Sequence, residues 1–116
     1  MKNFKNKVAA ITGAGSGIGQ QLAIALAKQG CHLSLCDVNE KGLADTVAQV
    51  KEHNVRVTTK KVNVAQLAEI QAWAADTIQN HGSVNLIFNN AGVALGSTVE
   101  GASYEELEWI VNINFW

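Results

Sequence analysis

The feature that most constrains the fold is a glycine-rich stretch, Thr12-Gly13-Ala14-Gly15-Ser16-Gly17-Ile18-Gly19. It joins the apolar run Val8–Ile11, which predicts a buried strand, to a segment with helical spacing from Gly17 to about Gln29. Gly30 then supplies a residue that readily ends a helix. A strand, a glycine turn and a helix in this order point backbone N–H groups at one place, where a phosphate can bind. By itself such a turn also occurs in proteins that bind no nucleotide.

The same alternation of short apolar runs and helical stretches continues along the chain. Further strands are predicted over Leu33–Cys36, Arg56–Val62 and Val84–Asn89. Helices are predicted after Asn39 as N-cap, over residues 65–80, and from the capping-box pattern Ser103-Tyr104-Glu105-Glu106 onward. Asn63 and Gln66 are expected to form a variant capping box. Residues expected on the inner helix faces are Ile18, Leu22, Ala25, Leu26, Leu43, Val47, Val50, Leu67, Ile70, Ala74 and Ile78.

Repeated strand–helix units predict an α/β fold with a Rossmann-like, doubly wound parallel sheet. The expected strand order is 3-2-1-4, with helices on both faces. Residues 1–116 are expected to form one dinucleotide-binding domain that is incomplete at its C-terminus, because two such halves build the full sheet. The apolar fourth strand would then lie at an open edge.

Composition excludes several classes of protein. With a net charge of −1 there is no basic surface for nucleic acid, and 47% hydrophobic residues suit a globular domain. No stretch resembles a signal peptide or reaches membrane-spanning length, so we expect a cytoplasmic protein with no membrane partner.

The cysteines and histidines predict no metal site. Cys31 and Cys36 flank a strand at a separation that sends their side chains to opposite faces, so we expect two buried, reduced thiols. His32, His53 and His81 belong to different elements and do not converge.

Asp37 follows the second strand, about 20 residues beyond the glycines. In this position a carboxylate can accept hydrogen bonds from the ribose hydroxyls of an adenosine. The alternative is an aspartate that caps a helix or closes a turn. As a ribose ligand it would repel a 2′-phosphate, and no Lys or Arg in the glycine loop or directly after Asp37 reverses that effect, which favours NAD over NADP.

Three segments together resemble the short-chain dehydrogenase/reductase family over essentially the whole chain. They are the Thr-Gly-x-x-x-Gly-x-Gly loop, Asn89-Asn90-Ala91-Gly92 after the fourth strand, and Ile113-Asn114-Phe115-Trp116 in the last helix. The resemblance implies an NAD-dependent oxidoreductase that moves hydride between the nicotinamide and a small alcohol or carbonyl substrate. It also implies a homo-oligomer, in which the helix containing Trp109 packs against its copy.

The resemblance assigns cofactor contacts to Gly13, Ser16, Gly17, Ile18, Gly19, Asp37, Asn63, Val64, Asn90, Ala91 and Gly92. Asn63 stands where the family more often has Asp, and it serves equally well as an N-cap. Asn85 also replaces a frequent Asp, with no consequence that the sequence reveals. Asn114 would help a catalytic lysine to hold a water, a role compatible with that of a buried helix asparagine.

The serine, tyrosine and lysine of the family's chemistry have no counterpart in these residues. Tyr104 is the only tyrosine, and no lysine follows Lys61. We therefore expect a fragment that carries the cofactor-binding half and is inactive alone. Two alternatives remain: a non-catalytic dinucleotide-binding or interaction module that a partner chain completes, and a remnant without function.

Overall fold

The computed structural model describes residues 4–90, which alternate between strand and helix. The elements are β1 (Val8–Thr12), α1 (Gly17–Lys28), β2 (His32–Asp37), α2 (Glu40–Val50), a 3-10 turn (Lys51–His53), β3 (Val57–Lys61), α3 (Leu67–His81) and β4 (Leu86–Asn89). Each strand and helix predicted up to residue 90 is present, and the ends differ by one or two residues. The helix predicted from Ser103 lies outside the described residues.

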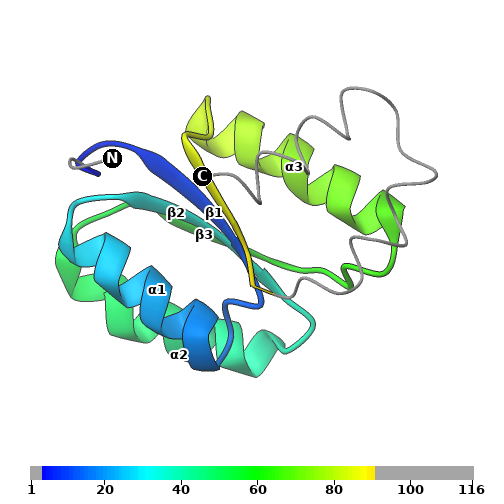
Figure 1. The fold of residues 1–116 in the computed structure, drawn as a ribbon, viewed down its shortest axis with the longest axis horizontal. Helices are drawn as coiled ribbons and strands as arrows, with labels where there is room; N and C mark the ends of the chain where they lie inside the picture. The colour runs from blue at the N-terminus through cyan, green and yellow to red at the C-terminus, as the bar shows by residue number, and fades with distance from the viewer. Residues whose placement is uncertain (1–3, 91–116) are drawn as a thin grey trace.

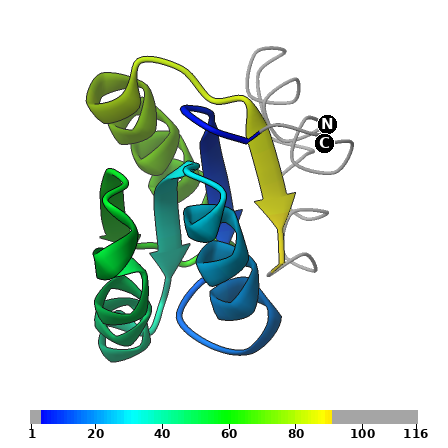
Figure 2. The ribbon, with the colours of Figure 1, turned by 90° about the vertical axis from the view of Figure 1, so that its left-hand side faces the viewer.

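The four strands form one parallel sheet in the predicted order β3-β2-β1-β4 (Figure 2). In β1, Ala10 pairs with Ser34 of β2 on one side and with Ile87 of β4 on the other. All five residues of β1 are buried, because neighbouring strands cover its edges and helices cover its faces. The predicted α/β fold with a Rossmann-like sheet is thus confirmed.

Helices α1 and α2 cover one face of the sheet and α3 covers the other (Figure 1). Successive strand residues alternate between the two resulting cores. The core under α1 and α2 is formed by Ala9, Ile11, Ala14, Ala23, Leu26, Ala27, Cys31, Leu33, Leu35, Leu43, Val50 and Leu86. The core under α3 is smaller and consists of Ala10, Cys36, Val62, Ile70, Trp73 and Ile87. Cys31 and Cys36 are free, buried thiols on opposite faces, as predicted.

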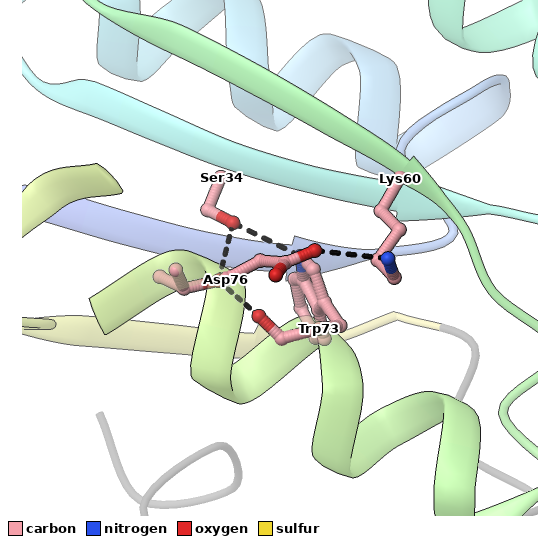
Figure 3. Close-up of polar contacts among 5 residues, drawn as sticks. Ser34, Lys60, Trp73 and Asp76 are labelled. Atoms are coloured by element: carbon pink, nitrogen blue, oxygen red, sulfur yellow. Dashed lines mark hydrogen bonds and ion pairs between the residues drawn. The ribbon is translucent and has the colours of Figure 1, made fainter. Parts of the chain in front are cut away.

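A closed ring of hydrogen bonds lies in the core under α3 (Figure 3). Trp73 is 1% exposed, and its Nε1 donates to Ser34 Oγ of β2 at 2.9 Å. Thr77 Oγ1 donates to the carbonyl oxygen of Trp73 at 2.8 Å, so the 2.7 Å contact between the two hydroxyls is donated by Ser34. Each buried polar side chain of the ring therefore has a partner. Toward solvent, Lys60 of β3 forms an ion pair with Asp76 at 2.9 Å.

The inner faces of α1 and α3 differ from the prediction at three residues. Ile18 is 76% exposed, Ala25 is exposed and Ile78 is 47% exposed. In α1 the buried stripe consists of Gly19, Ala23, Leu26 and Ala27, and all of these except Leu26 are small enough to let the helix lie close to the sheet. In α3 it consists of Ile70, Trp73 and Thr77, so Ile78 lies on the neighbouring, outer face.

The capping box predicted for Asn63 and Gln66 does not form. Gln66 is the N-cap of α3 but makes no side-chain cap, and the helix begins two residues later than predicted. Asn63 Oδ1 instead accepts from the Ala65 N–H at 3.0 Å, and Glu69 Oε1 accepts from the Asn63 N–H at 2.9 Å. The later start makes Glu69 the third residue of the helix, the position from which a carboxylate reaches back to an upstream N–H.

Candidate functional site

Three of the predicted segments meet at the carboxyl edge of the sheet, because parallel strands all end on the same side. The glycine loop follows β1, Asp37 ends β2, and Asn90 follows β4. Ala91, Gly92 and Asn114, the other predicted site residues at the end of the chain, lie outside the described residues.

Two kinds of constraint require glycine in the loop. Gly13 and Gly17 have φ angles of 63° and 55°, in the left-handed region that other residues avoid. Gly19 sits where a Cβ would lie 2.1 Å from the carbonyl oxygen of Gly13, so a side chain would separate the helix from the loop. The geometry thus gives two reasons for these glycines, a tight turn and a close approach of helix and loop.

The amino end of α1 is left without a cap. Ser16 is its N-cap residue, yet its side chain makes no cap hydrogen bond, and the first turn has no acidic residue. In contrast, α2 is capped by Asn39, whose Oδ1 accepts from the Gly42 N–H at 3.0 Å. The first N–H groups of α1 have no partner within the helix and carry the positive end of its dipole. Such a helix end can donate hydrogen bonds to an anion through these N–H groups, and the exposed Ile18 lies in the same turn.

Asp37 is held beside this helix end by two backbone groups. Its Oδ2 accepts from the Gly15 N–H at 2.8 Å, and its Oδ1 accepts from the Asn39 N–H at 3.1 Å. The bond to Asn39 is the turn role that the sequence left open, while the bond to Gly15 links the carboxylate directly to the glycine loop. A half-buried carboxylate with a fixed orientation keeps further lone pairs for a ligand.

Helix α2 supports the glycine loop from behind, a feature that the sequence did not reveal. Gly42 packs so closely that a Cβ on it would lie 2.4 Å from the carbonyl oxygen of Gly15. Thr46, which is fully buried, donates from Oγ1 to the carbonyl oxygen of Ala14 at 2.7 Å. The signal in the sequence was a glycine and a threonine four residues apart, on the same side of the predicted helix.

Two asparagines of β4 and its end join the loop to the edge of the sheet. Asn89 Oδ1 accepts from Thr12 Oγ1 at 3.1 Å, and Asn90 Nδ2 donates to the carbonyl oxygen of Gly13 at 3.4 Å. At the start of the same strands, Asn85 Oδ1 accepts from the Val8 N–H at 2.9 Å. The consequence of Asn85 that the sequence did not show is therefore alignment of β4 with β1.

Burial keeps the two cysteine thiols, one in β2 and one just before it, protonated at neutral pH. Burial raises the pKa of the Cys36 thiol far above its usual range, and the adjacent Asp37 carboxylate adds to this shift. Burial also raises the pKa of Cys31 to about 11. A buried thiol that stays protonated is a poor nucleophile.

His81 lies away from the site, at the amino edge of the sheet, where its Nε2 contacts Thr58 Oγ1 at 2.8 Å. Burial lowers its pKa, and the positive charge of Arg56 acts in the same direction. Within residues 4–90 no group of three or more potential metal ligands occurs. The helices of this part of the chain are also too short or too polar to cross a membrane.

Comparison with known proteins links this geometry to one family. A sequence profile described as short chain dehydrogenase matches residues 7–116. The oxidoreductase SadH of Mycobacterium tuberculosis is 37% identical over 116 residues, which cover 100% of this chain and 42% of that protein. The chain thus spans less than half the length of this relative.

Solved structures with similar folds contain either form of the nicotinamide dinucleotide. A short-chain dehydrogenase/reductase from Burkholderia phymatum in complex with NAD is 36% identical with a TM-score of 0.75, covering 98% of this chain and 41% of that one. A variant of actinorhodin polyketide ketoreductase with NADPH is 34% identical with a TM-score of 0.69, covering 72% of this chain and 32% of that one. These relatives indicate a nicotinamide dinucleotide as the class of cofactor. They do not distinguish NAD from NADP, which carries the additional 2′-phosphate.

Proposed function

Since the chain belongs to the short-chain dehydrogenase/reductase family, we propose that its protein transfers hydride between NAD and the hydroxyl or carbonyl carbon of a small substrate. The residues described above hold the adenosine and pyrophosphate part of the cofactor. The observation that carries the proposal is the uncapped amino end of α1 beside the carboxylate of Asp37.

The glycine loop fits a pyrophosphate. The N–H groups of Gly17, Ile18 and Gly19 are at the free end of α1, where an anion gains both hydrogen bonds and the helix dipole. Gly19 allows the close approach of the helix that brings these donors to the end of β1. Ser16 adds main-chain contacts beside them. When bound, the nicotinamide would supply the hydride chemistry.

Asp37 supports a preference for NAD. Its carboxylate, oriented by the Gly15 N–H, would accept hydrogen bonds from the ribose hydroxyls. A 2′-phosphate would place like charges in contact, and charges that close repel strongly at a partly buried site. NADP is therefore expected to bind less tightly than NAD.

The remaining predicted contacts complete the proposal. Asn63 and Val64 would lie by the adenine, and Asn90 with Ala91 and Gly92 would pass the nicotinamide ribose. Asn114 would help to position a water for proton transfer. The 116 residues contain no Tyr-x-x-x-Lys, so we propose that they do not turn over substrate alone. The family resemblance also supports a homo-oligomer for the whole protein, and we propose a cytoplasmic location for it.

Calorimetric titration of the purified protein with NAD⁺ and with NADP⁺ tests the proposal. NAD⁺ is expected to bind more tightly, and Asp37→Ala should weaken NAD⁺ binding and reduce the difference between the two cofactors. Asp76→Ala is the matched control, because it removes a carboxylate on α3 that pairs with Lys60. Tighter binding of NADP⁺, or an Asp37→Ala variant with unchanged affinities, would contradict the assignment of Asp37.

A turnover assay separates the oxidoreductase from the alternative of a non-catalytic binding module. A protein that joins these residues to the serine, tyrosine and lysine of the family's chemistry should reduce NAD⁺ with a small secondary alcohol, whereas residues 1–116 alone should not. Cofactor binding without turnover by the intact protein, across a panel of alcohols and ketones, would favour the module.

A further inference from the structure

We propose that Thr46 of α2 is a positioning residue for the dinucleotide-binding loop, so that it controls cofactor affinity without touching the cofactor. This inference rests on the proposed function. Thr46 lies outside the motifs that identify the site and comes from a different helix than the one that faces the pyrophosphate. Its side chain is 0% exposed, so a ligand cannot reach it directly.

The hydroxyl of Thr46 is oriented by its neighbours. Gln20 Nε2 of α1 donates to Thr46 Oγ1 at 2.9 Å, which leaves the hydroxyl proton to be donated elsewhere. Thr46 Oγ1 is 2.7 Å from the carbonyl oxygen of Ala14 and 3.1 Å from that of Gly42 in its own helix. The shorter contact makes Ala14 the main acceptor. The hydrogen bonds therefore run from α1 through α2 to the glycine loop.

The bond from Thr46 fixes the peptide that precedes the phosphate-binding turn. The N–H of Ala14 donates to the carbonyl oxygen of Cys36 at 3.1 Å, so both backbone groups of this buried residue are held. The next N–H, of Gly15, donates to Asp37. Together these bonds set the direction in which the chain leaves β1 and enters α1 at Ser16. The donors at the end of α1 depend on that direction.

Loss of the Thr46 hydroxyl would leave the carbonyl oxygen of Ala14 buried without its partner, which favours loop conformations that turn it toward water. The apparent dissociation constant is the intrinsic one divided by the fraction of molecules whose loop can bind, so it rises as that fraction falls. A neutral buried hydrogen bond shifts such an equilibrium by about tenfold. We therefore expect Thr46→Val, which keeps the shape of the side chain, to bind NAD⁺ about tenfold more weakly.

Thr77→Val provides a matched control. Thr77 is also a buried helical threonine whose hydroxyl bonds a carbonyl oxygen of its own helix and a side chain of another element, but it lies on the α3 face. Calorimetry gives the dissociation constant for NAD⁺, and urea unfolding gives the stability of each variant. Thr77→Val should be less stable than the unmodified protein and bind NAD⁺ with the same affinity. Thr46→Ser retains the hydroxyl and should restore affinity to within about twofold.

The outcomes are distinct. Wild-type affinity in a folded Thr46→Val variant, or an equal loss of affinity in Thr77→Val, would overturn the positioning role. If Thr46→Val does not fold, Gln20→Ala removes the amide that donates to Thr46 and to Asp45 and should still weaken NAD⁺ binding; unchanged affinity there would refute the inference. Absence of NAD⁺ binding by the unmodified protein would instead reject the proposed function on which the inference rests.

Discussion

Gly42→Ala adds one methyl group that has two opposing effects on stability, a gain in helix propensity and a steric overlap. Gly42 is in the first turn of α2, where alanine is normally the better helix former. In this fold, however, its Cβ would lie 2.4 Å from the carbonyl oxygen of Gly15 and 3.0 Å from the carbonyl carbon of the same residue. Both atoms belong to backbone that other hydrogen bonds hold in place, so neither can move like a flexible side chain.

The magnitudes decide the sign of the effect. The gain in helix propensity from glycine to alanine is about 1 kcal/mol inside a helix and smaller in its first turn. Overpacking against fixed atoms costs about 1–3 kcal/mol. We therefore expect Gly42→Ala to lower the free energy of unfolding by about 1–2 kcal/mol. Because the displaced atoms belong to the glycine loop, NAD⁺ binding should weaken as well.

Urea unfolding followed by far-UV circular dichroism measures the effect on stability. Ala44→Gly is the calibrating variant, since residue 44 is exposed on the same helix and reports helix propensity without a steric contact. It should destabilise the protein by about 1 kcal/mol. If Gly42→Ala proved more stable than the unmodified protein, the close approach of α2 to the loop would not constrain residue 42, and the reasoning would be refuted.

Three further predictions concern buried polar groups. Trp73→Phe removes the donor to Ser34 and leaves a small void, so unfolding in urea should show a loss of about 1–3 kcal/mol; an unchanged midpoint would contradict the ring of hydrogen bonds. His81 has a lowered pKa, so the folded protein binds a proton at this residue less readily than the unfolded chain does. Its contribution to the free energy of unfolding should be fully present above pH about 6.5 and be lost as the pH falls through the folded pKa. His81→Gln should reduce this pH dependence in acid titrations. Cys31 has its pKa raised to about 11, so its contribution to the free energy of unfolding should be present below pH about 9 and be lost as the pH rises toward 11. Ellman's reagent should label Cys31 and Cys36 only as fast as the protein opens, and rapid labelling of the folded protein would disprove their burial.

The strand order and the layers were predictable because they follow from short-range patterns. The apolar run Val8–Ile11, the glycines after it and the N-cap Asn39 each specify local structure, and the right-handed crossover rule leaves few ways to assemble the units. The errors on the inner helix faces came from helix rotation. In α1 the sheet is approached by Gly19 and Ala23, whose small size matters more than hydrophobicity, so a stripe chosen from the large apolar residue Ile18 was misplaced.

The parts of the site that were missed depend on contacts between distant elements. A threonine in the middle of a helix does not by itself show that its hydroxyl reaches a carbonyl oxygen 32 residues earlier, as that of Thr46 does. Asn85 looked like a neutral replacement, because its bond to Val8 depends on a pairing across 77 positions. The position of Asp37 beside the loop, in contrast, was predictable because strand, loop and acidic residue occur at a recognisable spacing.

The long separation in sequence between β1 and β4 also affects how the chain folds during its synthesis. Val8 and Asn85 are bonded across 77 positions, whereas β1 meets β2 after only one helix. At a synthesis rate of about 5–20 residues per second, a ribosome needs about 4–15 s to add the residues between the two strands. Throughout that interval the second edge of β1, the most buried strand of the sheet, has no partner. The nascent protein must therefore shield this edge from other chains, which makes slow translation between β2 and β4 a hazard and early chaperone contact an advantage.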